Sequence, residues 1–428
     1  MLLVVLVVLG LALAVYRGVL AWRLHAELAQ DRRAGLPDSL PQLAAVYLPP
    51  SGANAANLYL EAFAAYTPAL AAKGYYDRTL GDLETPRTWG AFRDDLRYLV
   101  TEGDLAENAR ALALLHRAAA AEGECRYPLD LASGFAADVT HLTRVRQGVR
   151  LLAIEARQHM LAGDGTSAVR AIGAILALAR SLRREPLLFS QLARISGEEA
   201  ALDSLERLLG EMVLSEADLT ALDRRLESED HDQMRRAVIG ERCCGLMLMA
   251  PQNYPLVDQS GKVLLWPALY RAGGALARER LAFLAVMRAC LEAAEAPFPQ
   301  RVAMSNAALQ RAEALPRVCV VARWFALPVA HALQRDLRLL ARLRAARVAL
   351  AVERHCAARG SLPATLADLV PEYLPVAVAD PYDGAPLRYR RRKTGYVIYS
   401  VGEDGTDGGG APRDPGSRSG DITFTVER

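Results

Sequence analysis

The apolar run at the N-terminus limits what this chain can fold into more than any other feature. Leu2 to Tyr16 is a stretch of fifteen residues without a charge. Arg17 can extend its guanidinium toward water, and the apolar residues up to Trp22 bring the run to about 20 residues, the length of a membrane-spanning helix. Tyr16 and Trp22 would then lie at the membrane surface. We therefore expect a single-pass signal anchor over residues 1–22.

A cleaved signal peptide is the alternative to a retained anchor. Ala12-Leu13-Ala14 resembles a cleavage site, but no basic residues precede the apolar run, which favours retention. The residues alone also do not determine on which side of the membrane the rest of the chain lies. The positive-inside rule would place in the cytoplasm the four arginines that follow the run, which are Arg17, Arg23, Arg32 and Arg33.

The composition predicts a large helical body behind this anchor. The chain has 428 residues, of which 52% are hydrophobic and only 6% aromatic, so its core must be built from Ala, Leu and Val. Helical segments alternate with short Gly and Pro breaks, a pattern typical of antiparallel helical hairpins. One such helix is expected from Asp104 to Ala121, Ser215 should cap another, and Leu327-Pro328 should precede the last long helix. We expect a juxtamembrane helix and connector over 23–52 and an α-helical body over 53–332. The balance of 51 basic and 49 acidic residues argues against a role in nucleic-acid binding.

Sequence motifs of common enzymes and metal sites are not found in the body. No P-loop, Gly-x-Ser-x-Gly or dinucleotide fingerprint follows a predicted strand, and the His-Glu-x-x-His signature does not occur. His141 and His159, with Glu155 four residues before the latter, could line one helix face, but the two histidines would lie five helical turns apart, too far to bind one ion. The six cysteines have no metal-binding spacing, so we expect unpaired core residues. Disulfides, which can form outside the cytoplasm, are the alternative.

The C-terminal segment predicts a small α+β module over residues 333–428. A helix from about Leu333 should end at Gly360, where a left-handed cap is expected, and Ser361 can cap a short helix after it. Three strands follow, with a turn at Thr394-Gly395 between the first two. They are predicted at Leu387 to Arg391, Tyr396 to Val401 and Asp421 to Val426. The whole chain is thus predicted to be mainly α, with a membrane helix, a helical-hairpin body and a terminal three-stranded antiparallel sheet.

The loop between the second and third strands contains the best candidate ligands. Gly402 to Gly420 includes Asp404, Asp407 and Asp414 among seven glycines. Glycine permits the positive φ angles that wrap backbone around an ion, and carboxylates with carbonyls suit Ca2+. The spacing is not that of an EF-hand, since no Glu closes a twelve-residue loop. A flexible Gly/Asp loop without a ligand is the alternative.

The order of motifs in this module resembles the C-terminal half of the type II secretion major pseudopilin. The resemblance rests on Gly360-Ser361-Leu362-Pro363, on Asp380 to Gly384 and on Tyr399 to Gly405, followed by Asp421-Ile422. It covers roughly residues 335–428 and implies a structural Ca2+ loop. The ligands that it implies are the side chains of Asp404, Asp407 and Asp421, a carbonyl from Ser400, and Asp414 as a spare.

The N-terminus departs from that family. Pseudopilins begin with a basic leader, a Gly cleavage site and a Glu five residues later, whereas this chain begins Met1-Leu2-Leu3-Val4. The layout as a whole resembles uncharacterised envelope proteins of planctomycete-like bacteria. We therefore expect a non-enzymatic, membrane-anchored protein of the bacterial inner membrane, mostly periplasmic, with protein partners on its helical body. The alternatives are a component of a type II secretion or pilus-like assembly and an envelope hydrolase.

Overall fold

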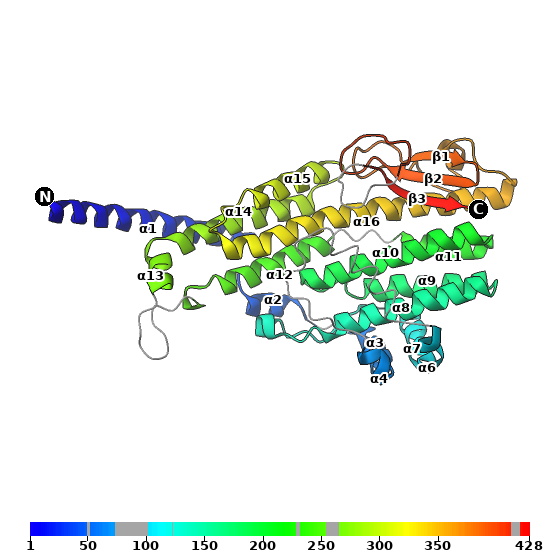
Figure 1. Ribbon diagram of the computed structural model, residues 1–428, viewed down its shortest axis with the longest axis horizontal. Coiled ribbons are helices and arrows are strands. Elements are labelled where there is room, and N and C mark those ends of the chain that lie inside the picture. The colour runs from blue at the N-terminus through cyan, green and yellow to red at the C-terminus, as the bar shows by residue number, and fades with distance from the viewer. Residues whose placement is uncertain (49–51, 73–101, 122, 228–231, 254–264, 412–419) are drawn as a thin grey trace.

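The computed structural model describes residues 1–48, 52–72, 102–121, 123–227, 232–253, 265–411 and 420–428. The molecule is elongated (Figure 1), with α1 projecting at one end and a small sheet near the other. The predicted fold class is confirmed, because the chain is mainly helical, with an N-terminal apolar helix and a C-terminal three-stranded antiparallel sheet.

The helices of the described residues follow one another with short connections. They are α1 (Leu2–Arg33), α2 (Leu40–Val46), α3 (Ala56–Ala64), α4 (Pro68–Ala72), α6 (Glu102–Glu107), α7 (Ala109–Ala120), η3 (Leu131–Ala136), α8 (Thr140–Leu161), α9 (Gly165–Arg180), α10 (Leu188–Glu211), α11 (Glu216–Leu226), α12 (Gln233–Leu248), η4 (Pro251–Asn253), α13 (Leu265–Ala272), α14 (Ala275–Glu295), α15 (Gln300–Glu313), α16 (Val320–Arg359) and η5 (Leu366–Leu369).

α1 joins the expected anchor and the expected juxtamembrane helix into one element. It is long and apolar enough to cross a membrane. Its apolar side chains from Leu3 to Val19 are exposed, and Leu20 is the first buried one. Beyond that point α1 packs on α14. The membrane segment and the folded body therefore share a continuous helix.

The body is a stack of antiparallel helices, as the Gly and Pro breaks predict. α8 packs on α9, and α9 on α10. Gly163 ends α8 with a φ of 75°, and the Asp164 carboxylate caps α9 by accepting the Ser167 N–H at 3.0 Å. The predicted cap at Ser215 is also present, because its Oγ accepts the Asp218 N–H at 3.1 Å. These turns are set by local sequence.

Asn108 interrupts the single helix expected from Asp104 to Ala121. Its buried side chain accepts the Thr67 N–H at 2.9 Å and donates to the Asp104 carbonyl at 2.8 Å. Because Asn108 satisfies backbone groups that a continuous helix would use, α6 and α7 are separate helices. Thr67, whose N–H binds the Asn108 side chain, lies 41 positions away in the chain, so helical periodicity could not indicate the break between α6 and α7.

α16 begins at Val320, earlier than the start near Leu333 that the sequence predicts. The Leu327-Pro328 pair indicated a break, but the helix passes through Pro328 and continues to Arg359. Ala326, Val329 and Ala330 around this proline are buried, so tertiary packing outweighs the missing N–H. The predicted start of the C-terminal module at residue 333 therefore lies inside a helix.

The helices and the sheet share a hydrophobic core. One cluster of buried residues extends from α2 to the sheet.

The sheet packs on the C-terminal half of α16 (Figure 1). Its strands lie in the order β1 (Arg388–Arg392), β2 (Gly395–Ser400) and β3 (Ile422–Glu427), and both pairs are antiparallel. Tyr396 is fully buried and donates to Glu353 on α16 at 2.8 Å. Gly360 takes the predicted left-handed cap, with a φ of 70°. However, Thr365 rather than Ser361 caps the short helix η5.

All six cysteines are free thiols. Cys243, Cys244, Cys290 and Cys319 are buried. Burial raises the pKa of Cys243 and of Cys290 to about 12, which makes both unreactive at neutral pH.

Glu241 on α12 should make the stability of the body depend on pH. Its buried carboxyl accepts the Leu188 N–H at 3.1 Å, and burial raises its pKa from the ordinary 4.5 to about 7. Between these values the folded protein keeps a proton that the unfolded chain releases, so stability is full below about pH 4.5 and falls as the pH rises through 7. The free energy of unfolding should drop by up to about 3 kcal/mol over this range.

Urea unfolding of the Glu241→Gln variant across this pH range checks that expectation. The substitution removes the titrating group and should flatten this part of the pH dependence. Glu107→Gln, at an exposed position on α6, is the matched control and should leave the dependence unchanged. Equal slopes for the wild type and Glu241→Gln would contradict the assignment.

Candidate functional site in the C-terminal loop

The loop that follows β2 is closed by tight backbone contacts. Gly402 follows the strand with a φ of 68°, and a Cβ there would lie 2.8 Å from the Gly420 carbonyl oxygen. A side chain at this position would therefore meet both steric and conformational strain. The two ends of the loop lie side by side, and Asp421 follows at the start of β3. This closure brings Asp404, Asp407 and Asp421 to the same end of the sheet.

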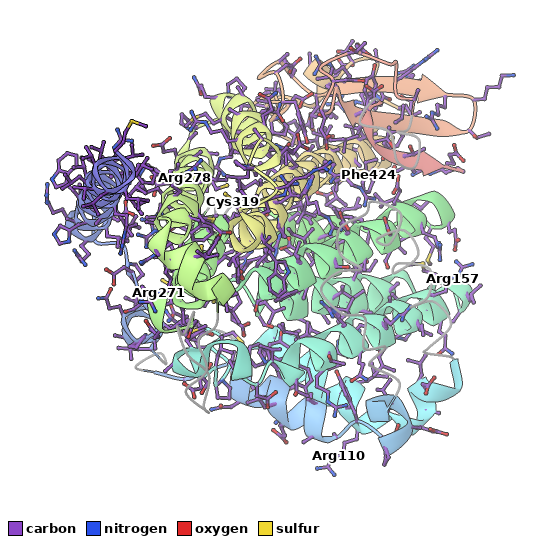
Figure 2. The ribbon with its side chains drawn as sticks, turned by 60° about the vertical axis from the view of Figure 1, so that its left-hand side comes forward. Arg110, Arg157, Arg271, Arg278, Cys319 and Phe424 are labelled. Carbon is purple, nitrogen blue, oxygen red and sulfur yellow. The ribbon has the colours of Figure 1, made fainter. Side chains whose placement is uncertain are left out.

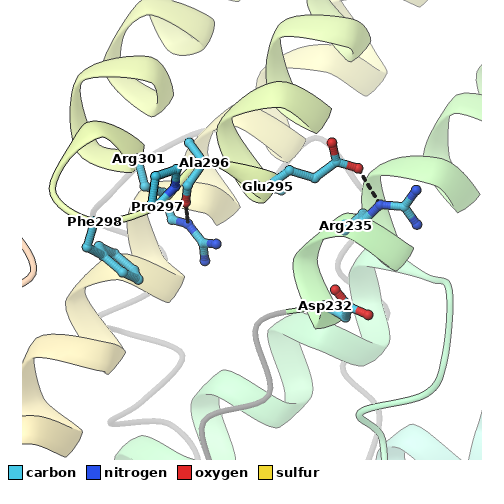
Figure 3. Close-up of a pocket in the computed structure, with 8 residues that line it drawn as sticks. Asp232, Arg235, Glu295, Ala296, Pro297, Phe298 and Arg301 are labelled. Carbon is cyan, nitrogen blue, oxygen red and sulfur yellow. Dashed lines mark hydrogen bonds and ion pairs between the residues drawn. The ribbon is translucent and has the colours of Figure 1, made fainter.

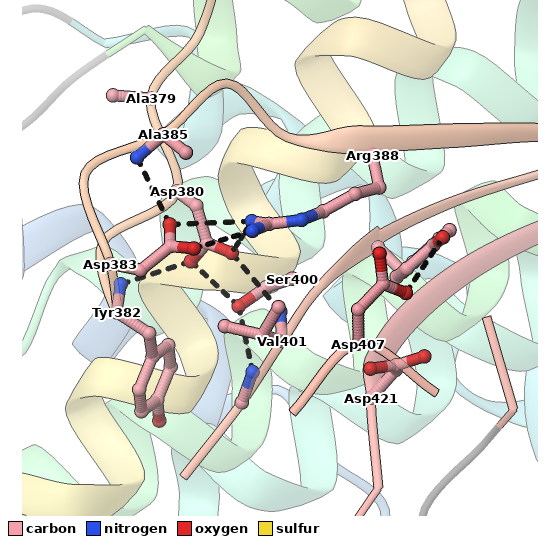
Figure 4. A network of polar contacts seen from close by, with 12 residues as sticks. Ala379, Asp380, Tyr382, Asp383, Ala385, Arg388, Ser400, Val401, Asp407 and Asp421 are labelled. Atoms are coloured by element: carbon pink, nitrogen blue, oxygen red, sulfur yellow. Dashed lines mark hydrogen bonds and ion pairs between the residues drawn. The ribbon is translucent and has the colours of Figure 1, made fainter. Parts of the chain in front are cut away.

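Asp380 is the centre of the polar network beside this loop (Figure 4). Its side chain is fully buried. One carboxylate oxygen accepts the Tyr382 N–H at 2.9 Å and the Ser400 hydroxyl at 2.7 Å. The other accepts the Val401 N–H at 3.0 Å and a guanidinium N–H of Arg388 at 2.7 Å. Asp380 therefore fastens the connection before β1 to the end of β2.

Arg388 on β1 supplies the charge that balances this buried carboxylate. The same guanidinium also donates to Asp383, and this contact holds the pKa of Asp383 below its usual range. The Asp383 carboxylate in turn accepts the Ala385 N–H at 3.0 Å. The Asp-Pro-Tyr-Asp-Gly motif thus forms a charge-paired turn, with one acid buried and the other near the surface.

Asp421 binds the backbone of the loop. It is almost completely buried, and its two carboxylate oxygens accept the Gly408 N–H at 3.2 Å and the Gly410 N–H at 2.7 Å. Its own N–H donates to the Ala411 carbonyl at 3.1 Å. A buried carboxylate that accepts two N–H groups can fold a glycine-rich segment without any ion.

Asp407 and Asp404 accept hydrogen bonds from the same loop. Asp407 accepts the Tyr399 hydroxyl at 3.1 Å and the Gly409 N–H at 2.9 Å. Burial, together with the Asp407 carboxylate, raises the pKa of Tyr399 to about 12. Asp404 is exposed and accepts N–H groups from Thr406 and Gly420, which lower its pKa. All three carboxylates therefore stabilise turns of the loop.

The structure brings together some of the predicted ligands but not all of them. Asp407 and Asp421 lie near each other at the sheet edge (Figure 4), and Asp404 contacts the residue before Asp421. The Ser400 side chain is turned toward Asp380. Asp414 lies outside the described residues. Among the residues that are described, no three His, Cys, Asp or Glu side chains are placed to hold a metal ion.

The donor chemistry suits a hard cation only in part. The carboxylates are oxygen donors of the kind that Ca2+ prefers, but those of Asp404 and Asp421 use both of their oxygens for N–H groups of the loop. Asp407 uses only Oδ1 for the contacts given above, which leaves its Oδ2 as the most available oxygen of the three. The calcium site stays a prediction.

Reasoning from the sequence missed the importance of Asp380 and Arg388. From the sequence, Asp380-Pro381 was expected only to keep the chain extended before a turn at Asp383-Gly384, and Arg388 to lie in a strand, without a contact between Asp380 and Arg388. The available signal was an Asp directly before Pro, followed by Asp-Gly and then by an arginine in a strand. Such an acid can cap its own turn, but its contacts with Ser400 and Val401 span 20 and 21 positions.

A second polar cluster, around Glu185, lies inside the helical body. Glu185 accepts from Ser190 and contacts His141 Nε2 at 2.8 Å. The His141 ring stacks on Tyr127, whose hydroxyl lies 2.9 Å from Ser181 Oγ. His141 therefore has a structural partner, and Glu155 pairs with His116 rather than with His159. These groups therefore partner one another in the interior of the body.

An open hollow of about 610 Å³ lies between α12 and the connection from α14 to α15 (Figure 3). Arg235 pairs with Glu295 across it, and Arg301 donates to the Ala296 carbonyl at 2.8 Å. The Arg301 guanidinium also stacks over the Phe298 ring, 4.7 Å from its centroid. Both acids of the hollow already have basic partners, Glu295 in Arg235 and Asp232 in Arg236, so the hollow indicates no particular ligand.

No protein-family model, curated protein or solved structure matches this chain.

Proposed function

We propose that the protein is a non-enzymatic scaffold anchored in a bacterial inner membrane, with most of its chain on the periplasmic side. Its helical body would bind protein partners and carry the C-terminal module away from the lipid. The observation that carries this proposal is the joint between α1 and the body. The apolar N-terminal part of α1 is exposed, whereas its C-terminal part is fixed by buried ion pairs.

Asp31 is the key residue of this joint. Its carboxylate accepts N–H groups of Arg242 on α12 at 2.6 Å and of Arg288 on α14 at 3.0 Å. Arg242 is 1% exposed and also donates to the Pro37 carbonyl at 2.6 Å. Glu27, one turn earlier on α1, accepts from Arg288. A membrane helix held in this way supports a fixed orientation of the body rather than a flexible tether.

α16 supports the scaffold proposal by its length. It starts beside α14 and ends under the sheet (Figure 1), and its 40 residues span about 60 Å at 1.5 Å per residue. Salt bridges along its length fasten it to other helices, including Arg342 to Asp203 at 2.9 Å and Arg347 to Asp223 at 3.2 Å. Such an arrangement suits a rigid spacer with a module at its far end.

Membrane topology is the first experiment for this proposal. We expect the full chain to stay with membranes after an alkaline wash, to keep Met1 in intact-mass measurements, and to be digested by protease added from the periplasmic side. A mature chain that begins after Ala14 would show a cleaved signal peptide and overturn the anchor. Protection from external protease, with digestion after lysis, would place the body in the cytoplasm and overturn the orientation.

We further propose that Ca2+ stabilises the C-terminal loop. Asp404, Asp407 and Asp421 would hold the ion together with backbone carbonyls, and its charge would replace some of the N–H groups that these carboxylates now accept. Binding to the folded loop alone would add to the free energy of unfolding, by about 2.7 kcal/mol at a hundredfold excess over Kd.

Thermal melts of the full chain, with millimolar Ca2+ and with chelator, test whether Ca2+ stabilises the loop. The full chain is needed because α16 belongs both to the body and to the module. We expect Ca2+ to raise Tm for the wild type and for the control variant Glu107→Gln, and to have no effect on Asp407→Asn. If the wild type had the same Tm with Ca2+ and with chelator, the calcium proposal would be wrong, and the loop would be folded by its own hydrogen bonds alone.

A further inference from the structure

The end of the body from which α1 emerges carries exposed apolar side chains on other helices. Leu269 on α13 is 58% exposed, and around the start of α16 Val318 is 74%, Val320 64% and Trp324 47% exposed. We call these four residues the end face. Soluble surfaces rarely expose several large apolar side chains near one another without a partner.

Hydrogen bonds hold the elements of the end face together. The buried carboxylate of Glu279 on α14 accepts the Tyr270 hydroxyl of α13 and, at 3.0 Å, the Ala322 N–H of α16. Figure 2 shows Arg271, Arg278 and Cys319 on the side of the body next to α1. The end face is therefore a fixed part of the fold, because Glu279 on α14 links its two parts, α13 and the start of α16.

If α1 spans a membrane, its contacts with α14 bring the end face close to the membrane surface. A Cβ on Gly274, at the start of α14, would lie 3.0 Å from Leu20 Cδ1 and 3.2 Å from Tyr16 Cε1. A straight helix from residue 1 to residue 20 covers about 30 Å, the thickness of the hydrocarbon layer. If that segment spans the bilayer, the body begins where the lipid headgroups begin.

The charges near the end face suit phospholipid headgroups. Arg17, Arg278 and Arg317 are exposed around it. Arginines can reach phosphate groups while their stems lie on apolar surface, and Trp and Tyr prefer the depth of the headgroups. Trp324 and Trp22, which is 69% exposed on α1, both have this chemistry.

From these observations we infer that the end face is a second membrane contact, which inserts Leu269, Val318, Val320 and Trp324 into the interface of the same bilayer that α1 spans. The inference rests on the proposed anchoring by α1. Two separate contacts would prevent the body from tilting about α1, so that α16 holds a defined angle to the membrane.

Fluorescence quenching in proteoliposomes tests the contact. The full chain is prepared with three of its four tryptophans replaced by Phe, which leaves either Trp324 or Trp22 as the reporter. The liposomes contain phosphatidylglycerol and phosphatidylcholine brominated on the acyl chains. We expect a loss of Trp324 emission comparable to that of Trp22. A variant in which all four are replaced, with Val376→Trp in the C-terminal module as its reporter, should keep its emission.

The reporters separate the two ways in which the inference can fail. Quenching of Trp22 without quenching of Trp324 would leave the anchor intact and overturn the second contact. A lack of quenching for both would overturn the anchor and the inference together. If Trp324 emission instead changes with protein density and not with bromination, the end face is covered by a second copy of the chain, which also overturns the lipid contact.

Discussion

Replacing Asp380 with Ala should unfold the C-terminal module or lower the free energy of unfolding by about 3–5 kcal/mol. The substitution removes a fully buried carboxylate that accepts two backbone N–H groups, one hydroxyl and one guanidinium. Arg388 then loses its buried partner, and the Val401 N–H loses its acceptor. Guanidinium unfolding of the full chain, followed by far-UV circular dichroism, measures the change.

Asp383→Ala is the matched control for this prediction. Asp383 binds the same arginine from a more exposed position, so its loss should cost at most about 1 kcal/mol. If the two variants lost similar amounts, burial of Asp380 would not be the source of the effect. Hydrogen exchange at Val401 and Gly402 gives a second readout, because we expect protection there to fall only in Asp380→Ala.

Asp31→Ala should destabilise the joint between α1 and the body by a similar amount, about 3–5 kcal/mol. The reason is that Arg242, which is 1% exposed, would keep its charge in the interior without its anionic partner. Arg288 would also lose one of its two acids. Thermal unfolding of the full chain in detergent micelles measures the loss.

Two further variants separate the buried ion pair from surface electrostatics. Asp38→Ala removes the partner of Arg32, whose side chain is 46% exposed, and should change stability by about 1 kcal/mol or less. The double variant Asp31→Leu with Arg242→Met removes both buried charges and should recover much of the loss. If this double variant were no more stable than Asp31→Ala, an isolated buried charge would not be the cause.

Local sequence determined the features of this protein that depend on neighbouring residues. The uncharged run from Leu2 to Tyr16 indicated the helix that projects from the body. Helical periodicity and Gly/Pro breaks predicted the stacked hairpins, and Gly360 and Ser215 predicted helix caps that are present. Alternating residues and the Thr394-Gly395 turn predicted the three strands. In each case, the signal lay within a few residues of the chain.

Tertiary contacts decided the rest, because the deciding partners lie far apart in the chain. Asn108 ends a helix through Thr67, 41 residues away, and Asp31 pairs with Arg242 over a separation of 211. Pro328 stays inside α16 because the residues around it are buried. The aspartates of the loop were found from sequence, but their hydrogen-bond partners were not. Periodicity and motif spacing report on neighbours along the chain, whereas a buried charge takes the partner that folding brings to it.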